Sequence, residues 1–285
     1  MAKASPTIQL PPACPPAVDG IRVGIGGWTY APWRDNFYPK GLVQRRELEY
    51  ASRHVSAIEI NGTWYGAQKP ATYAKWRDET PDGFLFSAKA PMRITMARTL
   101  ANTGAQVDAF LGDIAIMGDK LGPIVWQFDP VRRLQREDFA EFLSLLPQEI
   151  DGRRIRHVLD VRVAAFVDTG FLALARKHGM ATVFTDSADH PSFADVTADF
   201  VYARLMRSRA DEPTGYPREA LDRWSERARS WASGGRPDDL PYLEAKASVA
   251  PPRRDVFLYF ISSAKERNPA AAMALLRRLG AIVDG

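Results

Sequence analysis

Residues 55–89 of the chain are VSAIEINGTWYGAQKPATYAKWRDETPDGFLFSAK. Two short apolar runs, 55–61 and 84–89, predict strands, and the stretch 70–78 between them predicts a helix. The same alternation continues along the chain and predicts eight strands, at 21–26, 55–61, 84–89, 124–128, 157–162, 182–186, 201–206 and 256–262. Eight strands interleaved with helices are typical of a closed (β/α)₈ TIM barrel.

The segments between these strands have helical length. They lie near 42–53, 70–78, 102–120, 136–147, 164–179, 217–232 and 266–280, with a short one near 191–198. A doubly wound open sheet is the competing fold, but neither G-x-G-x-x-G nor G-x-x-x-x-G-K-[ST] occurs in the sequence. We therefore predict an α/β protein with one TIM-barrel domain over residues 21–283.

Two segments do not fit the barrel pattern. Residues 1–20 are rich in proline and lack apolar periodicity, so they predict a disordered tail. Residues 233–254 are rich in Gly and Pro and predict a long surface insertion before the eighth strand. Neither segment is expected to contribute to folding.

Composition narrows the class of protein. The 285 residues are 46% hydrophobic and 25% charged, as in soluble globular proteins, and no apolar run is long enough for a membrane helix. A single cysteine, Cys14, excludes an intrachain disulfide and a thiolate metal site, and favours the cytoplasm. The net charge of +4 is weak support for a nucleic-acid partner.

Polar side chains lie at the strand ends where TIM-barrel enzymes carry their active sites. Because side chains alternate along a strand, Glu59 and Asn61 are expected to point inward when Ile58 and Ile60 face the helices. The same reasoning gives a cluster at the C-terminal mouth of the barrel: Glu59, Asn61, Lys89, Gln127, Asp160, Arg162, Asp186 and Arg204. Its three carboxylates and three cations cancel, so a site for chemistry and a salt-bridge network that only fills the mouth both remain open.

The order of these residues resembles one known family. Gly24-Ile25-Gly26-Gly27-Trp28, Ile58-Glu59-Ile60-Asn61 and Phe86-Ser87-Ala88-Lys89-Ala90-Pro91, followed by Gln127, Asp160 with Arg162, Asp186, Arg204 and Tyr259-Phe260, are similar to the domain of unknown function 72 (YecE-like) family. The resemblance covers about residues 21–280. It implies a TIM barrel loosely related to sugar isomerases, but no settled reaction.

The chain departs from the family pattern at three histidines. The corresponding positions hold Met96, Val163 and Met206. If these histidines carry proton transfer or metal binding elsewhere in the family, the resemblance implies that this member has altered or lost that chemistry.

Two functions are compatible with these residues. The first is an enzyme, for example an isomerase, lyase or hydrolase, that acts by acid/base chemistry on a small polar, anionic or sugar-like substrate. Its catalytic residues would be Glu59, Lys89, Asp160 and Asp186, and its substrate-binding residues would be Trp28, Tyr30, Asn61, Tyr65, Gln127, Arg162 and Arg204. The second is a non-catalytic barrel that binds a ligand or a nucleic acid.

The remaining expectations concern cofactors and partners. Glu59, Asp160 and Asp186 could hold a divalent cation through oxygen ligands, but three nearby cations could equally neutralise them, so no metal ligand is assigned and the cofactor is left unknown. We expect a small-molecule substrate as the partner and no membrane. The oligomeric state is not predicted.

Overall fold

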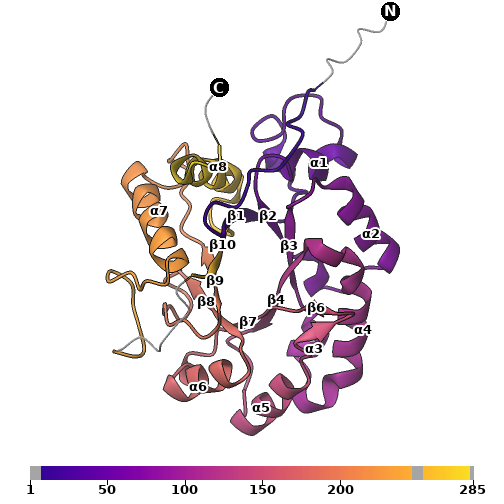
Figure 1. Cartoon of the computed structure of the whole chain (residues 1–285), viewed down its shortest axis with the longest axis vertical. Coiled ribbons are helices and arrows are strands. Elements are labelled where there is room, and N and C mark those ends of the chain that lie inside the picture. The colour runs from indigo at the N-terminus through magenta and orange to yellow at the C-terminus, as the bar shows by residue number, and fades with distance from the viewer. Residues whose placement is uncertain (1–7, 246–252, 283–285) are drawn as a thin grey trace, which may run out of the picture.

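The computed structural model describes residues 8–245 and 253–282. Eight parallel strands close into a barrel in the order β1-β10-β9-β8-β7-β4-β3-β2 (Figure 1). The strands are β1 (Ile21–Gly26), β2 (Ala57–Ile60), β3 (Leu85–Lys89), β4 (Leu121–Phe128), β7 (His157–Val161), β8 (Ala181–Thr185), β9 (Phe200–Leu205) and β10 (Asp255–Phe260). The predicted TIM barrel is confirmed, and each predicted strand is present with its ends shifted by no more than a few residues.

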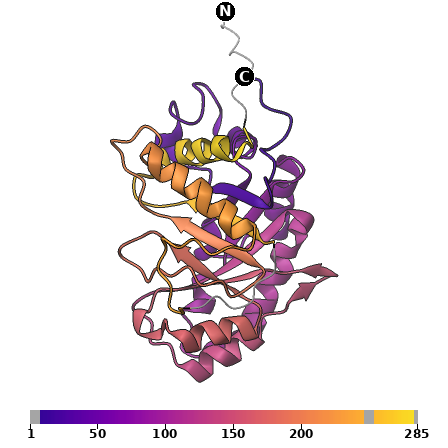
Figure 2. The same ribbon diagram turned by 60° about the vertical axis from the view of Figure 1, so that its left-hand side comes forward.

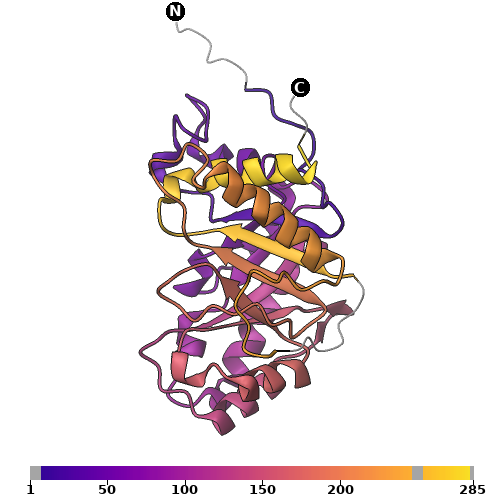
Figure 3. The ribbon, with the colours of Figure 1, turned by 90° about the vertical axis from the view of Figure 1, so that its left-hand side faces the viewer.

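Helices surround this barrel. They are α1 (Glu47–Ala51), α2 (Pro70–Glu79), α3 (Met92–Thr95), α4 (Gly104–Ile114), α5 (Arg136–Ser144), α6 (Thr169–Lys177), α7 (Arg218–Ala232) and α8 (Asn268–Leu279), with short 3₁₀ turns between several of them. Figure 3 shows α7 and α8 lying over the strands of the C-terminal half. A small hairpin of β5 (Glu149–Ile150) and β6 (Arg153–Arg154) projects from the barrel (Figure 2).

The helix predicted near 191–198 does not form. Residues 186–199, between β8 and β9, have neither helical nor strand structure. Asp195 in this loop instead accepts hydrogen bonds from the backbone N–H groups of Leu243 (2.7 Å) and Glu244 (3.2 Å). The loop is therefore held by hydrogen bonds to the segment before β10.

Side-chain alternation divides the core in two. Val125, Val158 and Val183 point into the barrel together with Tyr202 and Tyr259, while the larger core lies between strands and helices. Gly24 is required by this close packing, because a Cβ there would lie 2.2 Å from the Ala57 carbonyl oxygen. The inward row of each strand leads directly to the mouth of the barrel.

The expectation of a disordered tail over 1–20 is wrong for residues 8–20. Pro15 is buried, Ile8 and Cys14 pack against the core, and Val18 pairs with Ile21 through two backbone hydrogen bonds of 2.8 and 3.2 Å. Apolar side chains without helical or strand periodicity can still be buried on a surface that the barrel provides. Residues 1–7 lie outside the described part of the chain.

The segment 233–254 also packs more closely than predicted. Leu240 and Tyr242 contact the core. Arg254 is buried and donates hydrogen bonds to the carbonyl groups of Trp231, Gly234 and Gly235. Residues 246–252 of this insertion lie outside the described residues. Throughout the described chain, none of the helices combines the length and the apolar character needed to cross a bilayer.

Candidate active site at the barrel mouth

Arg204, near the end of β9, is the centre of a buried polar network. Its Nε and Nη2 donate to the two oxygens of Glu59 on β2, at 2.9 and 2.5 Å. Its Nη1 donates to Asp160 Oδ2 at 2.6 Å. Arg204 is 2% exposed and Glu59 is fully buried, so these charges are compensated inside the barrel rather than by water.

The network extends outward from Arg204 to the surface of the mouth. Arg162, after β7, donates from Nε to Asp160 Oδ2 at 3.1 Å. Gln127 on β4 accepts from Arg204 Nη1 at 3.2 Å and donates to Asp129 at 2.6 Å. Although burial opposes ionisation, the guanidinium groups of Arg204 and Arg162 lower the pKa of Asp160 below its usual value. Asp160 is therefore an ionised hydrogen-bond acceptor and a weak base.

Lys89, the last residue of β3, lies beside this network without joining it. None of the ion pairs within 4.0 Å in the described part of the chain includes its ammonium group, which instead lies over the Trp64 ring, 4.2 Å from the centroid. Burial, followed by the charge of Arg204, lowers the pKa of Lys89 to about 8. A lysine with this pKa can hold or release a proton near neutral pH.

Asp186 does not belong to this cluster, in contrast to the sequence-based expectation. It follows Thr185 on β8 and has the opposite orientation, because side chains alternate. Its carboxylate accepts from the backbone N–H of Met206 (2.5 Å) and from the Tyr216 hydroxyl (2.8 Å) on the side of α7. Burial raises the pKa of Asp186, so its environment also differs from that of Asp160.

The carboxylates of the mouth differ from those expected from the sequence. Two of the predicted carboxylates, Glu59 and Asp160, lie with three cations, Lys89, Arg162 and Arg204. Asp129, which accepts a hydrogen bond from Gln127, adds a third carboxylate in place of Asp186. The formal charges of the mouth therefore balance when Lys89 is protonated.

The four remaining predicted ligand-binding residues are dispersed. The ring of Trp28 packs edge-on against Trp76 of α2 and Phe86, so it is part of the packing under the loop. Tyr30 lies under Lys265, whose ammonium is 4.6 Å from the ring centroid. Asn61 is half-buried and hydrogen-bonds weakly to the Glu59 carbonyl (3.4 Å), and Tyr65 is 81% exposed. Trp28 is thus held by packing contacts with Trp76 and Phe86 and not by any residue of the mouth cluster.

The site residues predicted from the sequence did not include Tyr202, Trp64 or His190. The Tyr202 hydroxyl donates to Glu59 Oε2 at 2.7 Å, and its position two residues before Arg204 was a signal of inward orientation. Burial, followed by the charge of Arg162, lowers the pKa of His190. Its Nδ1 is buried without a hydrogen-bond partner.

The described residues contain no group of three or more His, Cys, Asp or Glu side chains arranged to hold a metal ion. The two carboxylates that remain at the mouth are both engaged by Arg204. The expected three-carboxylate set is not assembled, because Asp186 lies on the other side of β8.

Comparison with known proteins shows the same architecture and the same family. The Escherichia coli K12 protein YecE is 30% identical over 140 residues, 48% of this chain and 48% of YecE, so the match spans about half the length of that relative. A DUF72 family protein from Thermotoga maritima shares the fold, with a TM-score of 0.66 and 16% identity over 90% of this chain and 96% of that chain. A DUF72 family protein from Enterococcus faecalis shares it with a TM-score of 0.65 and 16% identity over 93% of this chain and 97% of that chain. The model of the family described as protein of unknown function DUF72 matches residues 22–284, and the chain belongs to this family.

Proposed function

We propose that the protein is an enzyme that binds a small polar, anionic or sugar-like substrate at the C-terminal mouth of the barrel and acts on it by acid/base chemistry. The observation that carries the proposal is Lys89: it is buried at a strand end, has no carboxylate partner within ion-pair distance among the described residues, and has a pKa lowered to about 8. A titratable group held in this way is suited to transferring a proton near neutral pH.

The neighbouring groups suggest how the roles are divided. Lys89 transfers the proton, while Arg162, 14% exposed at its side chain, contacts the anionic part of the substrate. Glu59 is unsuited to be the base, because it is fully buried and its two oxygens accept three hydrogen bonds from Arg204 and Tyr202. We assign it the positioning of Arg204. Gln127 and Asn61 remain candidates for contacts to substrate hydroxyl groups.

A non-catalytic ligand- or nucleic-acid-binding barrel is the alternative. The cations Lys89 and Arg162 of the mouth would serve that role equally well, whereas the lowered pKa of Lys89 favours catalysis. The enzyme and the binding barrel differ in whether a bound compound is converted. They also differ in whether Lys89 is needed for proton transfer or only for its positive charge.

The test uses the full chain and a panel of sugar phosphates and sugar acids in D₂O, with conversion and deuterium incorporation followed by NMR. Lys89→Arg keeps a cation but removes a proton-transfer group near pH 8, Lys89→Met removes both, and Lys75→Met on the exposed face of α2 is the matched control. We expect conversion by the wild type to rise with pH through about 8. Both Lys89 variants should lose on the order of 100-fold or more in rate, while Lys75→Met retains it.

Two results would contradict the proposal, the first its enzymatic activity and the second the role of Lys89 in proton transfer. One is saturable binding of panel compounds by the wild type without any conversion, which supports the binding barrel. The other is conversion that Lys89→Arg carries out as fast as the wild type, which assigns Lys89 only an electrostatic role.

A further inference from the structure

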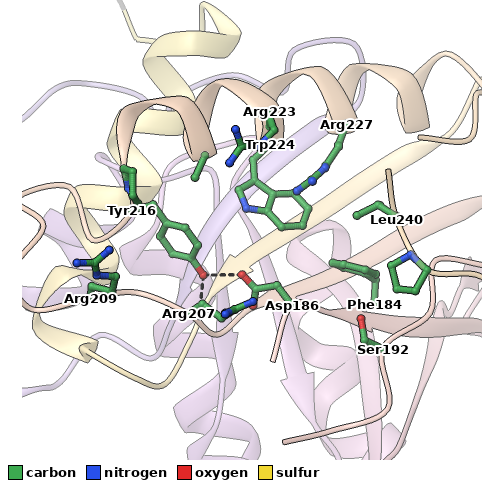
Figure 4. Close-up of a pocket in the computed structure, with 13 residues that line it drawn as sticks. Phe184, Asp186, Ser192, Arg207, Arg209, Tyr216, Arg223, Trp224, Arg227 and Leu240 are labelled. Atoms are coloured by element: carbon green, nitrogen blue, oxygen red, sulfur yellow. Dashed lines mark hydrogen bonds between the residues drawn. The ribbon is translucent and has the colours of Figure 1, made fainter. Parts of the chain in front are cut away.

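A second pocket lies between the ends of β8 and β9 and the first half of α7. Its volume is about 430 Å³, within the range of pockets for small ligands, roughly 300–1,000 Å³. Figure 4 shows Trp224 reaching down from α7, with Phe184 and Asp186 on the strand side and Tyr216 at one end. None of the residues that line this pocket belongs to the cluster around Arg204.

The floor of the pocket is a closed chain of hydrogen bonds. The Tyr216 hydroxyl donates to Asp186 Oδ2 at 2.8 Å and accepts from the backbone N–H of Arg207 at 2.7 Å (Figure 4). The other Asp186 oxygen accepts from the backbone N–H of Met206 at 2.5 Å. Tyr216 is 4% exposed. The single carboxylate of the lining is therefore already occupied by protein donors and makes no ion pair with the arginines around it.

Four arginines line the same pocket, and their partners divide them into two kinds. Arg227 lies over the Trp224 ring, 4.3 Å from the centroid, and is fixed by Asp239 at 2.6 Å, while Arg209 is paired with Asp211 at 2.5 Å. The exposed Arg207 and Arg223 take part in none of the side-chain hydrogen bonds or ion pairs found within residues 8–245 and 253–282. Among the described residues, these two guanidinium groups have no carboxylate within 4.0 Å, although Arg207 acts on the charge of Asp186 and Arg223 on that of Asp239 at longer range. They border a pocket whose only lining carboxylate, Asp186, already accepts protein hydrogen bonds.

We propose that this pocket binds the phosphate group of a small organic phosphate, with Arg207 and Arg223 as its ligands and Trp224 as a wall for the organic part. A guanidinium presents paired N–H donors that match phosphate oxygens, and two such groups supply the charge that a phosphate monoester requires. The indole of Trp224, over which Arg227 lies, is an apolar part of the pocket lining. The volume suits a sugar phosphate or a mononucleotide better than a polymer.

The experiment measures binding to the full chain by isothermal titration calorimetry at low salt. Glucose 6-phosphate and AMP are compared with glucose and adenosine, and inorganic phosphate is titrated separately. Arg207→Gln and Arg223→Gln remove one guanidinium each. Arg218→Gln removes an exposed arginine from the same helix outside the pocket and is the matched control.

We expect at least one of the two organic phosphates to bind, with each dephosphorylated counterpart at least tenfold weaker. Each pocket variant should weaken binding about tenfold or more, since each loses charge-assisted hydrogen bonds, and Arg218→Gln should remain within about twofold. Inorganic phosphate that binds as tightly as the organic phosphates would still place a phosphate at Arg207 and Arg223, but would show that the organic part makes no contact.

The proposal is overturned if phosphorylated and dephosphorylated compounds bind alike, if neither organic phosphate binds, or if the two pocket variants bind like the wild type. It is also overturned if an oligonucleotide binds where AMP and glucose 6-phosphate do not. Because the pocket is separate from the barrel mouth, Lys89→Met should retain phosphate binding, so failure of this proposal and failure of the enzyme proposal are distinguishable.

Discussion

Arg204 binds Glu59 inside the barrel through two hydrogen bonds, Nε to Oε2 at 2.9 Å and Nη2 to Oε1 at 2.5 Å. The pair joins β9 to β2, two strands that are not neighbours in the barrel. Because both side chains are almost completely buried, neither charge can be compensated by water if the other is removed. The pair therefore links the stability of the barrel to the arrangement of the mouth.

Arg204→Met should destabilise the protein by about 3–5 kcal/mol, because it leaves Glu59 as an uncompensated buried charge. The free energy of unfolding in urea measures this loss. Arg278→Gln, which breaks an exposed pair with Asp222, is the control and should cost less than about 1 kcal/mol. A loss below about 1 kcal/mol for Arg204→Met would show that the buried pair does not stabilise the barrel.

Lys89 should make stability rise with pH in an unusual window. Its pKa is lowered from 10.5 to about 8 in the folded protein, so between these values the unfolded chain binds the extra proton. The free energy of unfolding should therefore increase between pH 8 and 10.5, by at most about 3 kcal/mol. Lys89→Met lacks this proton, and its stability relative to the wild type should fall over the same window. Parallel curves for the two proteins would contradict the lowered pKa.

His157 should make the protein sensitive to mild acid. It accepts from Trp126 Nε1 at 3.1 Å and donates from Nε2 to the Pro147 carbonyl at 2.7 Å, and burial lowers its pKa to about 4. The unfolded chain binds the proton first, so stability is lost as pH falls from 6.5 toward 4, by at most about 3 kcal/mol. Urea unfolding at several pH values gives the free energy of unfolding as a function of pH, and this free energy should change less with pH for His157→Gln than for the wild type. An equal pH dependence in the two proteins would assign the acid sensitivity to other groups.

Removal of residues 1–18 should lower the melting temperature by about 2–5 °C, because Pro15 and Cys14 cover part of the barrel. Two point variants localise the effect. Pro15→Asp places a charge at a buried position and should reproduce part of the loss, whereas Pro11→Asp at an exposed position should not. An unchanged melting temperature for the truncated protein would show that the packing of residues 8–18 contributes nothing.

The site was predictable where strand parity decides the direction of a side chain. Glu59, Lys89, Asp160 and Arg204 follow the inward rows of β2, β3, β7 and β9, and the barrel brings them together. The sixth predicted strand extended to Asp186, whereas β8 ends at Thr185, the last residue of its inward row. Because successive side chains point to opposite faces of the strand, Asp186 points away from the barrel interior and lies in a different pocket from Glu59 and Asp160.

The sequence by itself determined the barrel, because eight apolar runs interleaved with helical stretches bury their surface best when the strands close on themselves. It also determined which strands carry charges at their ends. Only the tertiary structure decided that Arg204 binds both Glu59 and Asp160, so that Lys89 has no carboxylate within ion-pair distance among the described residues. Such pairing depends on distances across the barrel between strands far apart in the chain, and spacing along one strand carries no information about them.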